Sequence, residues 1–132
     1  MQEELEHKLI IKYPRLFKGI TKPLTQNLMA FGIECGDGWY NILDKLFAKL
    51  NKYKDIELMQ VKEKFGGLRI YINGVNTKYS DKVYDLIDKA EAKSFKTCEM
   101  CGKPGKNQTI NNWVYTVCKD HKQQLLKDAP VD

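Results

Sequence analysis

Four side chains that commonly bind metal ions lie close together in the last third of the chain. Cys98 and Cys101 are separated by two residues, and Cys118 and His121 repeat that spacing after 16 further residues. Two ligands at this spacing can bind one ion, because a tight turn points both side chains the same way, and Gly102 supplies the backbone freedom for such a turn. Three cysteines and one histidine form the closed tetrahedral shell typical of structural zinc. The spacing therefore predicts one structural Zn²⁺ per chain, with no open position for hydrolytic chemistry.

A disulfide with one unpaired thiol is the alternative use of these cysteines. The chain begins with the acidic segment 1–6, which has no apolar core and does not resemble a secretory signal. Cysteines in a reducing compartment are more often metal ligands than disulfide partners. No apolar run approaches the roughly 18 residues that a membrane span needs. We therefore expect a cytoplasmic protein that binds zinc and does not enter a membrane.

A basic hairpin is the second candidate site. Gly66-Gly67 predicts a two-residue turn that lets a ligand approach the backbone closely. The lysines beside it can neutralise phosphate, and an arginine can bind phosphate through two parallel hydrogen bonds. A tyrosine and a nearby tryptophan offer stacking faces. The expected ligand-binding residues are Lys62, Lys64, Gly66, Gly67, Arg69, Tyr71 and Trp39. The alternative is a solvent-facing hairpin in which Arg69 pairs with Glu63 or Glu91.

The segment 34–40 offers the only basis for covalent chemistry. A cysteine near a helix start, such as Cys35, can have a lowered pKa and act as a nucleophile. No base is evident, because His121 is assigned to the metal and His7 lies in the first predicted helix. Asp37 is explained as a helix N-cap. We therefore expect no catalytic residue. An enzyme that uses Cys35, or a carboxylate pair, is the alternative, and its candidate acids are Glu34, Asp37, Glu63 and Glu91.

The elements that position these residues follow from the periodicity of the apolar side chains. Recurrence at three- and four-residue steps predicts helices over residues 2–12, 38–53, 80–94 and 119–127. Alternation and β-branched residues predict strands over residues 31–35, 55–64, 68–72 and 113–117. A short helical turn is expected at 24–29. Ile56, Leu58 and Gln60 are expected to share one strand face, and Ser80 is expected to cap the helix that follows it.

These elements predict an α+β fold, with helices packed on a small antiparallel sheet and a zinc ribbon at the C-terminus. The 132 residues suffice for one domain with its own core. We expect a single domain over 1–132, with an α+β core at 1–96 and a zinc-ribbon subdomain at 97–128. Composition excludes a disordered chain, a collagen and a coiled coil.

The chain resembles a family of small zinc-binding proteins found in bacteriophage and prophage genomes. The resemblance rests on two segments, Gln60 to Tyr71 and Cys98 to Gly105. The resemblance extends to residues 13–17, 34–40, 90–94 and 118–121, and so covers most of the chain. It implies a phage-encoded protein that acts in the cytoplasm of a bacterial host.

The net charge of +5 favours a polyanionic partner. We therefore expect a small non-enzymatic zinc-ribbon protein that binds a nucleotide or a nucleic acid. The implied phage setting suggests that it counters a bacterial defence. A protein–protein inhibitor or adaptor that acts on a host bacterial protein is the alternative.

Overall fold

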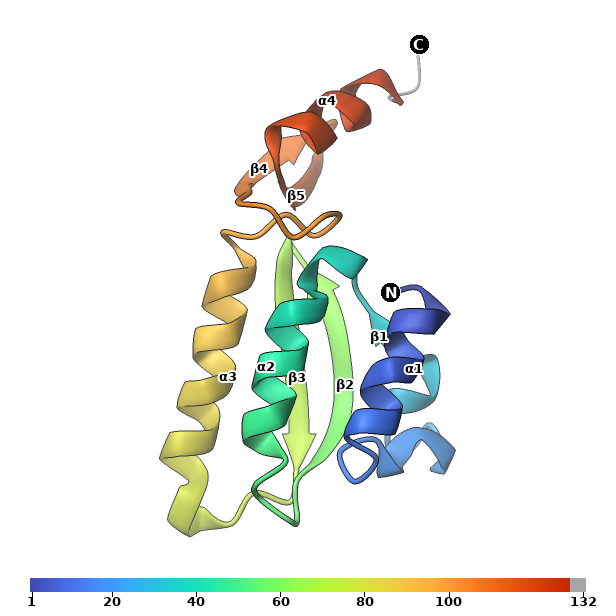
Figure 1. Ribbon diagram of the computed structural model, residues 1–132, viewed down its shortest axis with the longest axis vertical. Coiled ribbons are helices and arrows are strands. Elements are labelled where there is room, and N and C mark those ends of the chain that lie inside the picture. Colours follow the sequence, from blue (N-terminus) through green and yellow to red (C-terminus); the bar gives the residue numbers. More distant parts are fainter. Residues whose placement is uncertain (129–132) are drawn as a thin grey trace.

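Three helices cover one face of a three-stranded sheet (Figure 1). The computed structural model describes residues 1–128. The helices of this layer are α1 (Glu3–Lys12), α2 (Tyr40–Leu50) and α3 (Ser80–Ser94). The strands are β1 (Ile33–Glu34), β2 (Glu57–Lys64) and β3 (Gly67–Asn73), in the order β1-β2-β3. The predicted α+β class is therefore confirmed.

The predicted antiparallel arrangement is wrong for β1. Ile33 pairs with Val61 in a parallel ladder, whereas β2 and β3 are antiparallel, so the sheet is mixed. The chain passes through α2 between β1 and β2, and a crossover of this kind returns the second strand in the same direction as the first. The two-residue length of β1 hid this arrangement from sequence patterns.

A second, smaller unit lies beyond the end of the sheet at which α3 ends (Figure 1). It consists of the antiparallel strands β4 (Lys106–Ile110) and β5 (Trp113–Val117), followed by α4 (Lys119–Lys127). The predictions of β5 and α4 are confirmed. Strand β4 was not predicted, because Ile110 is its only buried residue and the other four show no apolar alternation.

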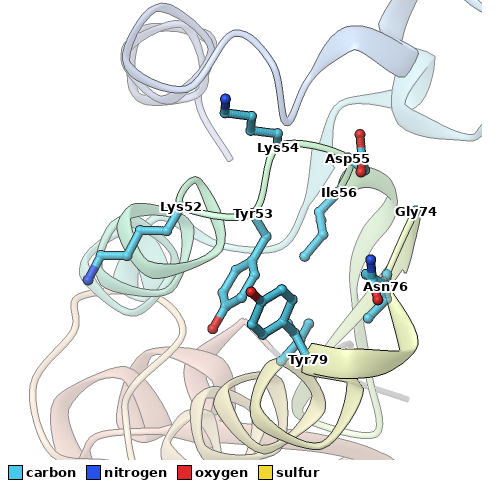
Figure 2. A pocket seen from close by; sticks show the side chains of 10 residues that line it. Lys52, Tyr53, Lys54, Asp55, Ile56, Gly74, Asn76 and Tyr79 are labelled. Carbon is cyan, nitrogen blue, oxygen red and sulfur yellow. The ribbon is translucent and has the colours of Figure 1, made fainter.

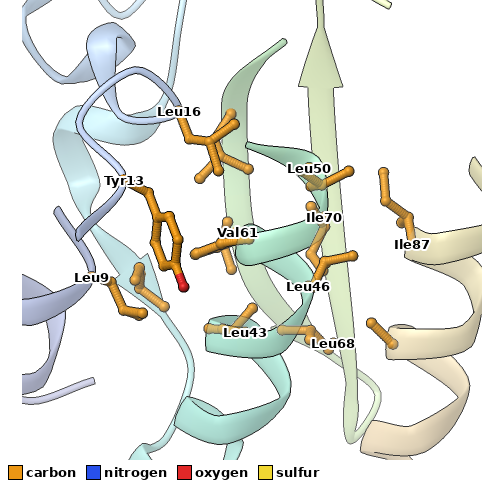
Figure 3. Close-up of a cluster of buried hydrophobic side chains, with 14 of the residues drawn as sticks. Leu9, Tyr13, Leu16, Leu43, Leu46, Leu50, Val61, Leu68, Ile70 and Ile87 are labelled. Carbon is orange, nitrogen blue, oxygen red and sulfur yellow. The ribbon is translucent and has the colours of Figure 1, made fainter. Parts of the chain in front are cut away.

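The main core lies between the helices and the sheet (Figure 3). Leu43, Leu46 and Leu50 of α2 point toward the sheet, and the ring of Phe47 packs edge-on against Tyr13 and Phe17, with centroids 6.1 and 5.6 Å apart. Each fully buried aliphatic side chain contributes about 1.5–3 kcal/mol to stability. This core fixes the orientation of β2 and β3, which carry the predicted ligand-binding residues.

A β-bulge changes the predicted face of β2. The ladder with β3 shifts register between Leu58 and Gln60, so the buried apolar side chains of β2 are Leu58 and Val61. Gln60 instead pairs with Tyr71 on the opposite face. An extra residue in one strand reverses the alternation that follows it. The predicted grouping of Gln60 with Ile56 and Leu58 is therefore wrong.

The turn between β2 and β3 lies one residue earlier than predicted. Its central residues are Phe65 and Gly66, with φ angles of 55° and 79°, and Lys64 pairs with Gly67. Two positive φ angles are characteristic of the type I′ hairpin turn. Gly67 belongs to β3, where a Cβ atom would collide with the ring of Phe95.

Some helix ends also differ from the prediction. Helix α2 begins at Tyr40, after a 3₁₀ turn over Asp37–Trp39, and ends at Leu50. Asp37 does not cap it, because its carboxylate accepts the backbone N–H of Gln2 at 2.8 Å. Ser80 is the first residue of α3 and makes no capping hydrogen bond. The helical turn expected at 24–29 is replaced by 3₁₀ turns at Lys18–Thr21 and Met29–Phe31.

Candidate metal centre and ligand-binding face

The four predicted metal ligands meet at one point in the C-terminal unit. One ligand atom from each of Cys98, Cys101, Cys118 and His121 lies within 4.8 Å of the others. The Sγ atoms of Cys101 and Cys118 are 3.7 Å apart. The Nδ1 atom of His121 lies 3.6 Å from Cys98 Sγ and 3.2 Å from Cys118 Sγ. None of the cysteines is in a disulfide. The group could therefore hold a metal ion.

Two local structures position these ligands. The first is the turn after Cys98, in which Gly102 has a φ of 81° and donates its N–H to the carbonyl of Cys98 at 2.9 Å. The second is the start of α4, where Cys118 is the N-cap and His121 lies in the first turn. The backbone N–H of His121, at the start of α4, is the largest of the causes that lower the pKa of the Cys118 thiol to about 6. A thiolate at this position also interacts favourably with the positive end of the helix.

The C-terminal unit is hydrogen-bonded to the core through Glu99 and Thr97. Glu99 accepts the N–H of Gly36 on its carboxylate at 2.9 Å and the N–H of Gly38 on its carbonyl at 2.7 Å. The indole N–H of Trp39 donates to the carbonyl of Thr97 at 2.9 Å. A Cβ atom at Gly36 or Gly38 would collide with this segment. The two glycines are therefore needed for the close contact between the units.

The C-terminal hairpin also covers the turn between β2 and β3. The hydroxyl of Thr116 donates to the carbonyl of Gly66 at 2.6 Å, and the side-chain amide of Asn107 donates to the carbonyl of Phe65 at 3.3 Å. Gly66 and Gly67 are both buried. The glycine turn that we expected to be open to a ligand is therefore closed by the chain itself.

Trp39 must also be removed from the expected ligand surface. Its side chain is fully buried beneath the start of α2, and its one polar atom is used by Thr97. Burial is the usual fate of a tryptophan at the beginning of an apolar helix stripe. Trp39 connects the core to the C-terminal unit and cannot stack on a ligand at the surface.

The other four expected ligand residues do share one surface, which we call the open sheet face. Lys62 pairs with Arg69 across β2 and β3, and Tyr71 pairs with Gln60, so these side chains project from the face opposite the helix layer. Lys64 lies two residues beyond Lys62 on the same face. Tyr71 is 46% exposed. The register of β1 places Glu34 beside Lys62 on this face, and Glu91 at the edge of β3 lies close enough to Arg69 to interact with its charge.

Arg69 does not form the ion pair that we considered as its alternative role. None of the ion pairs within residues 1–128 includes Arg69. Its Nε is buried and has no hydrogen-bond partner. The carboxylates of Glu63 and Glu91 instead accept backbone N–H groups, from Gly66 at 2.7 Å and from Ile70 at 2.9 Å. Arg69 therefore has no ion-pair partner within residues 1–128, although its positive charge acts on the nearby carboxylate of Glu91.

Glu91 and Ser94 protect the free edge of β3. Ser94 Oγ accepts the N–H of Leu68 at 2.9 Å, one turn of α3 away from the contact between Glu91 and Ile70. Burial raises the pKa of Glu91, and this effect exceeds the opposing effects of the Ile70 N–H and the Arg69 charge. The edge N–H groups of β3 are thus satisfied by a helix instead of a fourth strand.

Cys35 has the properties of a structural residue. It is 6% exposed, and burial is the largest cause that raises its pKa to about 12, followed by the charge of Glu99. A thiol with this pKa is almost entirely protonated at neutral pH and is a poor nucleophile.

A pocket of about 410 Å³ lies at the far end of the core, between the end of α2 and the start of α3 (Figure 2). The rings of Tyr53 and Tyr79 form part of its wall, with centroids 5.4 Å apart. Lys52 and Lys54 extend away from these rings in Figure 2. The sequence patterns did not identify this pocket, and the directions of the two lysines do not favour an anionic ligand there.

The fold and the four-ligand group define a small α+β protein that could hold one metal ion in its C-terminal unit. Comparisons with protein families, with curated proteins and with solved structures find no match to this chain. Within residues 1–128, the structure contains no helix with the length and apolar character needed to cross a membrane.

Proposed function

We propose that the chain is a non-enzymatic binding protein that holds one structural zinc ion and takes a phosphate-bearing ligand, a nucleotide or a nucleic acid, on the open sheet face. The observation that carries the proposal is the placement of Lys62, Lys64, Arg69 and Tyr71 together on the face opposite the helix layer. An enzyme that uses Cys35 is not proposed, because its thiol is buried and protonated.

The distances within the metal-ligand group support zinc. Zn–S bonds of about 2.3 Å and a Zn–N bond of about 2.0 Å put tetrahedral sulfur atoms about 3.8 Å apart and sulfur and nitrogen about 3.5 Å apart. The observed separations are 3.7 Å between Cys101 and Cys118, 3.6 Å between Cys98 and His121 and a shorter 3.2 Å between Cys118 and His121, and all four ligand atoms lie within 4.8 Å of one another. With all four positions filled by protein, the ion would hold the C-terminal ribbon together and would bind no substrate.

The chemistry of the open sheet face supports a phosphate ligand. Three cations against Glu34 on the face and Glu91 at its edge leave net positive charge, and the planar guanidinium of Arg69, which is in no ion pair within residues 1–128, suits two parallel hydrogen bonds to a phosphate. Tyr71 offers a ring on which a base can stack.

Salt-dependent binding tests this proposal. If the three cations contact phosphates, affinity for a single-stranded oligonucleotide should fall about 20-fold between 50 and 200 mM salt. Arg69→Lys should weaken binding without changing the melting temperature, because lysine keeps the charge and loses the planar fork. Arg15→Lys is the matched control, since Arg15 is the other arginine and bonds to the carbonyl of Asn51. Binding that is insensitive to salt and to Arg69→Lys would contradict the proposal.

A protein partner is the second candidate, favoured by a groove between α2 and α3. Four lysines form its rim and four apolar residues form its floor; these are Lys45, Lys49, Lys89 and Lys93, and Ile42, Leu46, Leu86 and Ala90. Lys89 pairs with Asp85, and the other three rim lysines have no ion-pair partner within residues 1–128. Charge complementarity selects an acidic amphipathic helix of a host protein as the occupant.

An acidic amphipathic model peptide tests this second candidate. It should gain helical circular dichroism when the protein is added, and Lys49→Glu with Lys93→Glu should abolish the gain. A peptide that stays unfolded at high protein concentration would eliminate the groove as a helix-docking site.

A further inference from the structure

Phe65 and Trp113 line one pocket where the β2–β3 turn meets the hairpin of β4 and β5. The pocket has a volume of about 440 Å³, and its walls are Glu63, Lys64, Phe65, Asn112, Trp113 and Val114. The two aromatic side chains are 66% and 64% exposed. Neither belongs to either hydrophobic cluster of the fold. Their packing therefore does not explain why two large aromatic residues lie here.

Trp113 is held in place by the metal-ligand unit. It is the first residue of β5, pairs with Ile110 across a turn formed by Asn111 and Asn112, and lies five residues before Cys118. Thr116 of the same strand is bonded to Gly66. The register of β5 is therefore anchored at both the metal ligands and the core, and this register places Trp113 in the wall of the same pocket as Phe65.

The pocket is continuous with the open sheet face. Lys64 belongs to both, and its Nζ lies 5.6 Å from the centroid of the Phe65 ring. Gln60, which pairs with Tyr71, is five residues from Phe65, or about 17 Å along the strand. The cations of the open sheet face thus lie between Tyr71 at one end and the pocket of Phe65 and Trp113 at the other.

We propose that Phe65 and Trp113 hold an unstacked base of a single-stranded nucleic acid whose phosphates run along Lys62, Lys64 and Arg69. The inference rests on the proposed function, because the same face must bind the phosphates. The bases of a single strand are free to stack on protein rings while its phosphates contact cations. The bases of a duplex are already stacked and paired with one another. Glu63 does not oppose this arrangement, because its carboxylate is bonded to the N–H of Gly66 at 2.7 Å.

Three oligonucleotides of equal charge distinguish the possibilities: (dT)₁₂, a 12-nucleotide abasic strand, and a 12-nucleotide hairpin duplex. The protein should bind (dT)₁₂ about 5- to 150-fold more tightly than the abasic strand, since stacking acts only on bases. (U)₁₂ distinguishes RNA from DNA as the source of the strand. Binding of (dT)₁₂ should quench Trp113 emission, and Trp113→Phe identifies this signal, because buried Trp39 is then the only tryptophan.

Trp113→Ala should lower the affinity for (dT)₁₂ at least about 5-fold toward that for the abasic strand, because Phe65 and Tyr71 still offer rings, and should leave abasic binding unchanged. Tyr84→Ala is the matched control, because Tyr84 is an exposed aromatic residue of α3 in the other unit. Equal affinity for all three strands, with unchanged Trp113 emission, would overturn the inference and leave the phosphate face intact. Failure to bind any of the three would overturn the proposed function as well.

Discussion

If the four ligands bind zinc as proposed, removal of the ion should unfold the C-terminal unit before the core. The buried hydrophobic residues of that unit are Cys98, Ile110 and Val117. Burial of the two aliphatic side chains contributes about 3–6 kcal/mol. A structural zinc ion contributes about 10–16 kcal/mol in zinc-finger peptides. The metal is therefore the larger stabilising term, and residues 97–128 should lose their structure without it.

The core should remain folded but less stable. Five of the hydrogen bonds that it would lose to the C-terminal unit involve Gly36, Gly38, Trp39, Phe65 and Gly66. At about 0.5–1.5 kcal/mol each, these five bonds amount to roughly 3–8 kcal/mol. The large apolar core between the helices and the sheet is unaffected by the metal. A loss of 1 kcal/mol lowers the melting temperature of a domain of this size by about 4–8 °C. We therefore expect the melting temperature of the core to fall by about 10 °C or more.

Hydrogen exchange measured by mass spectrometry resolves the two units. After chelation, amides of β4 and β5 should exchange rapidly, while amides of α2 and α3 should stay protected. Cys101 is exposed, so a chelator can reach the ion. Cys118→Ser should reproduce the pattern, and Cys35→Ala should keep one zinc per chain, because Cys35 lies outside the ligand group.

The reasoning would be refuted by unchanged protection of β4 and β5 in protein that metal analysis shows to be free of zinc. A disulfide mapped between two of the three ligand cysteines in freshly purified protein would refute the zinc assignment itself.

Three further predictions concern the residues around the sheet. Ser94→Ala leaves the buried N–H of Leu68 without an acceptor and should cost about 1–3 kcal/mol in denaturant unfolding, whereas Ala92→Ser on the exposed side of α3 should cost little. The pKa of Glu91 is raised above 4.5, so its ionised form costs stability at neutral pH, and that cost disappears as the pH falls below 4.5. Glu91→Gln should therefore raise the melting temperature at pH 7 and leave it nearly unchanged at pH 4; equal effects at both values would contradict the assigned cause. Iodoacetamide at pH 7 should leave Cys35 unmodified in the folded, zinc-loaded protein, and rapid alkylation would show that the thiol is neither buried nor protonated.

The spacing of residues along the chain was sufficient for the metal-ligand group and for the elements with a regular apolar period, but not for the helix caps or the exact position of the hairpin turn. The two-residue gaps between Cys98 and Cys101 and between Cys118 and His121 predicted the ligand group, because a short turn determines where both side chains point. The apolar stripes predicted the long helices and the alternation of β3, because burial of one face imposes a period on the sequence.

Contacts between distant residues decided the rest. The bond from Thr116 to Gly66 joins residues 50 positions apart, and it closes the glycine turn that appeared open from sequence alone. The bulge near Met59 and the parallel pairing of β1 leave no local signature, because each depends on the partner strand. The open sheet face and the pocket of Phe65 and Trp113 likewise exist only where separate segments meet. Local periodicity identifies which side of an element is buried, but only packing against other elements determines which exposed residues form one surface.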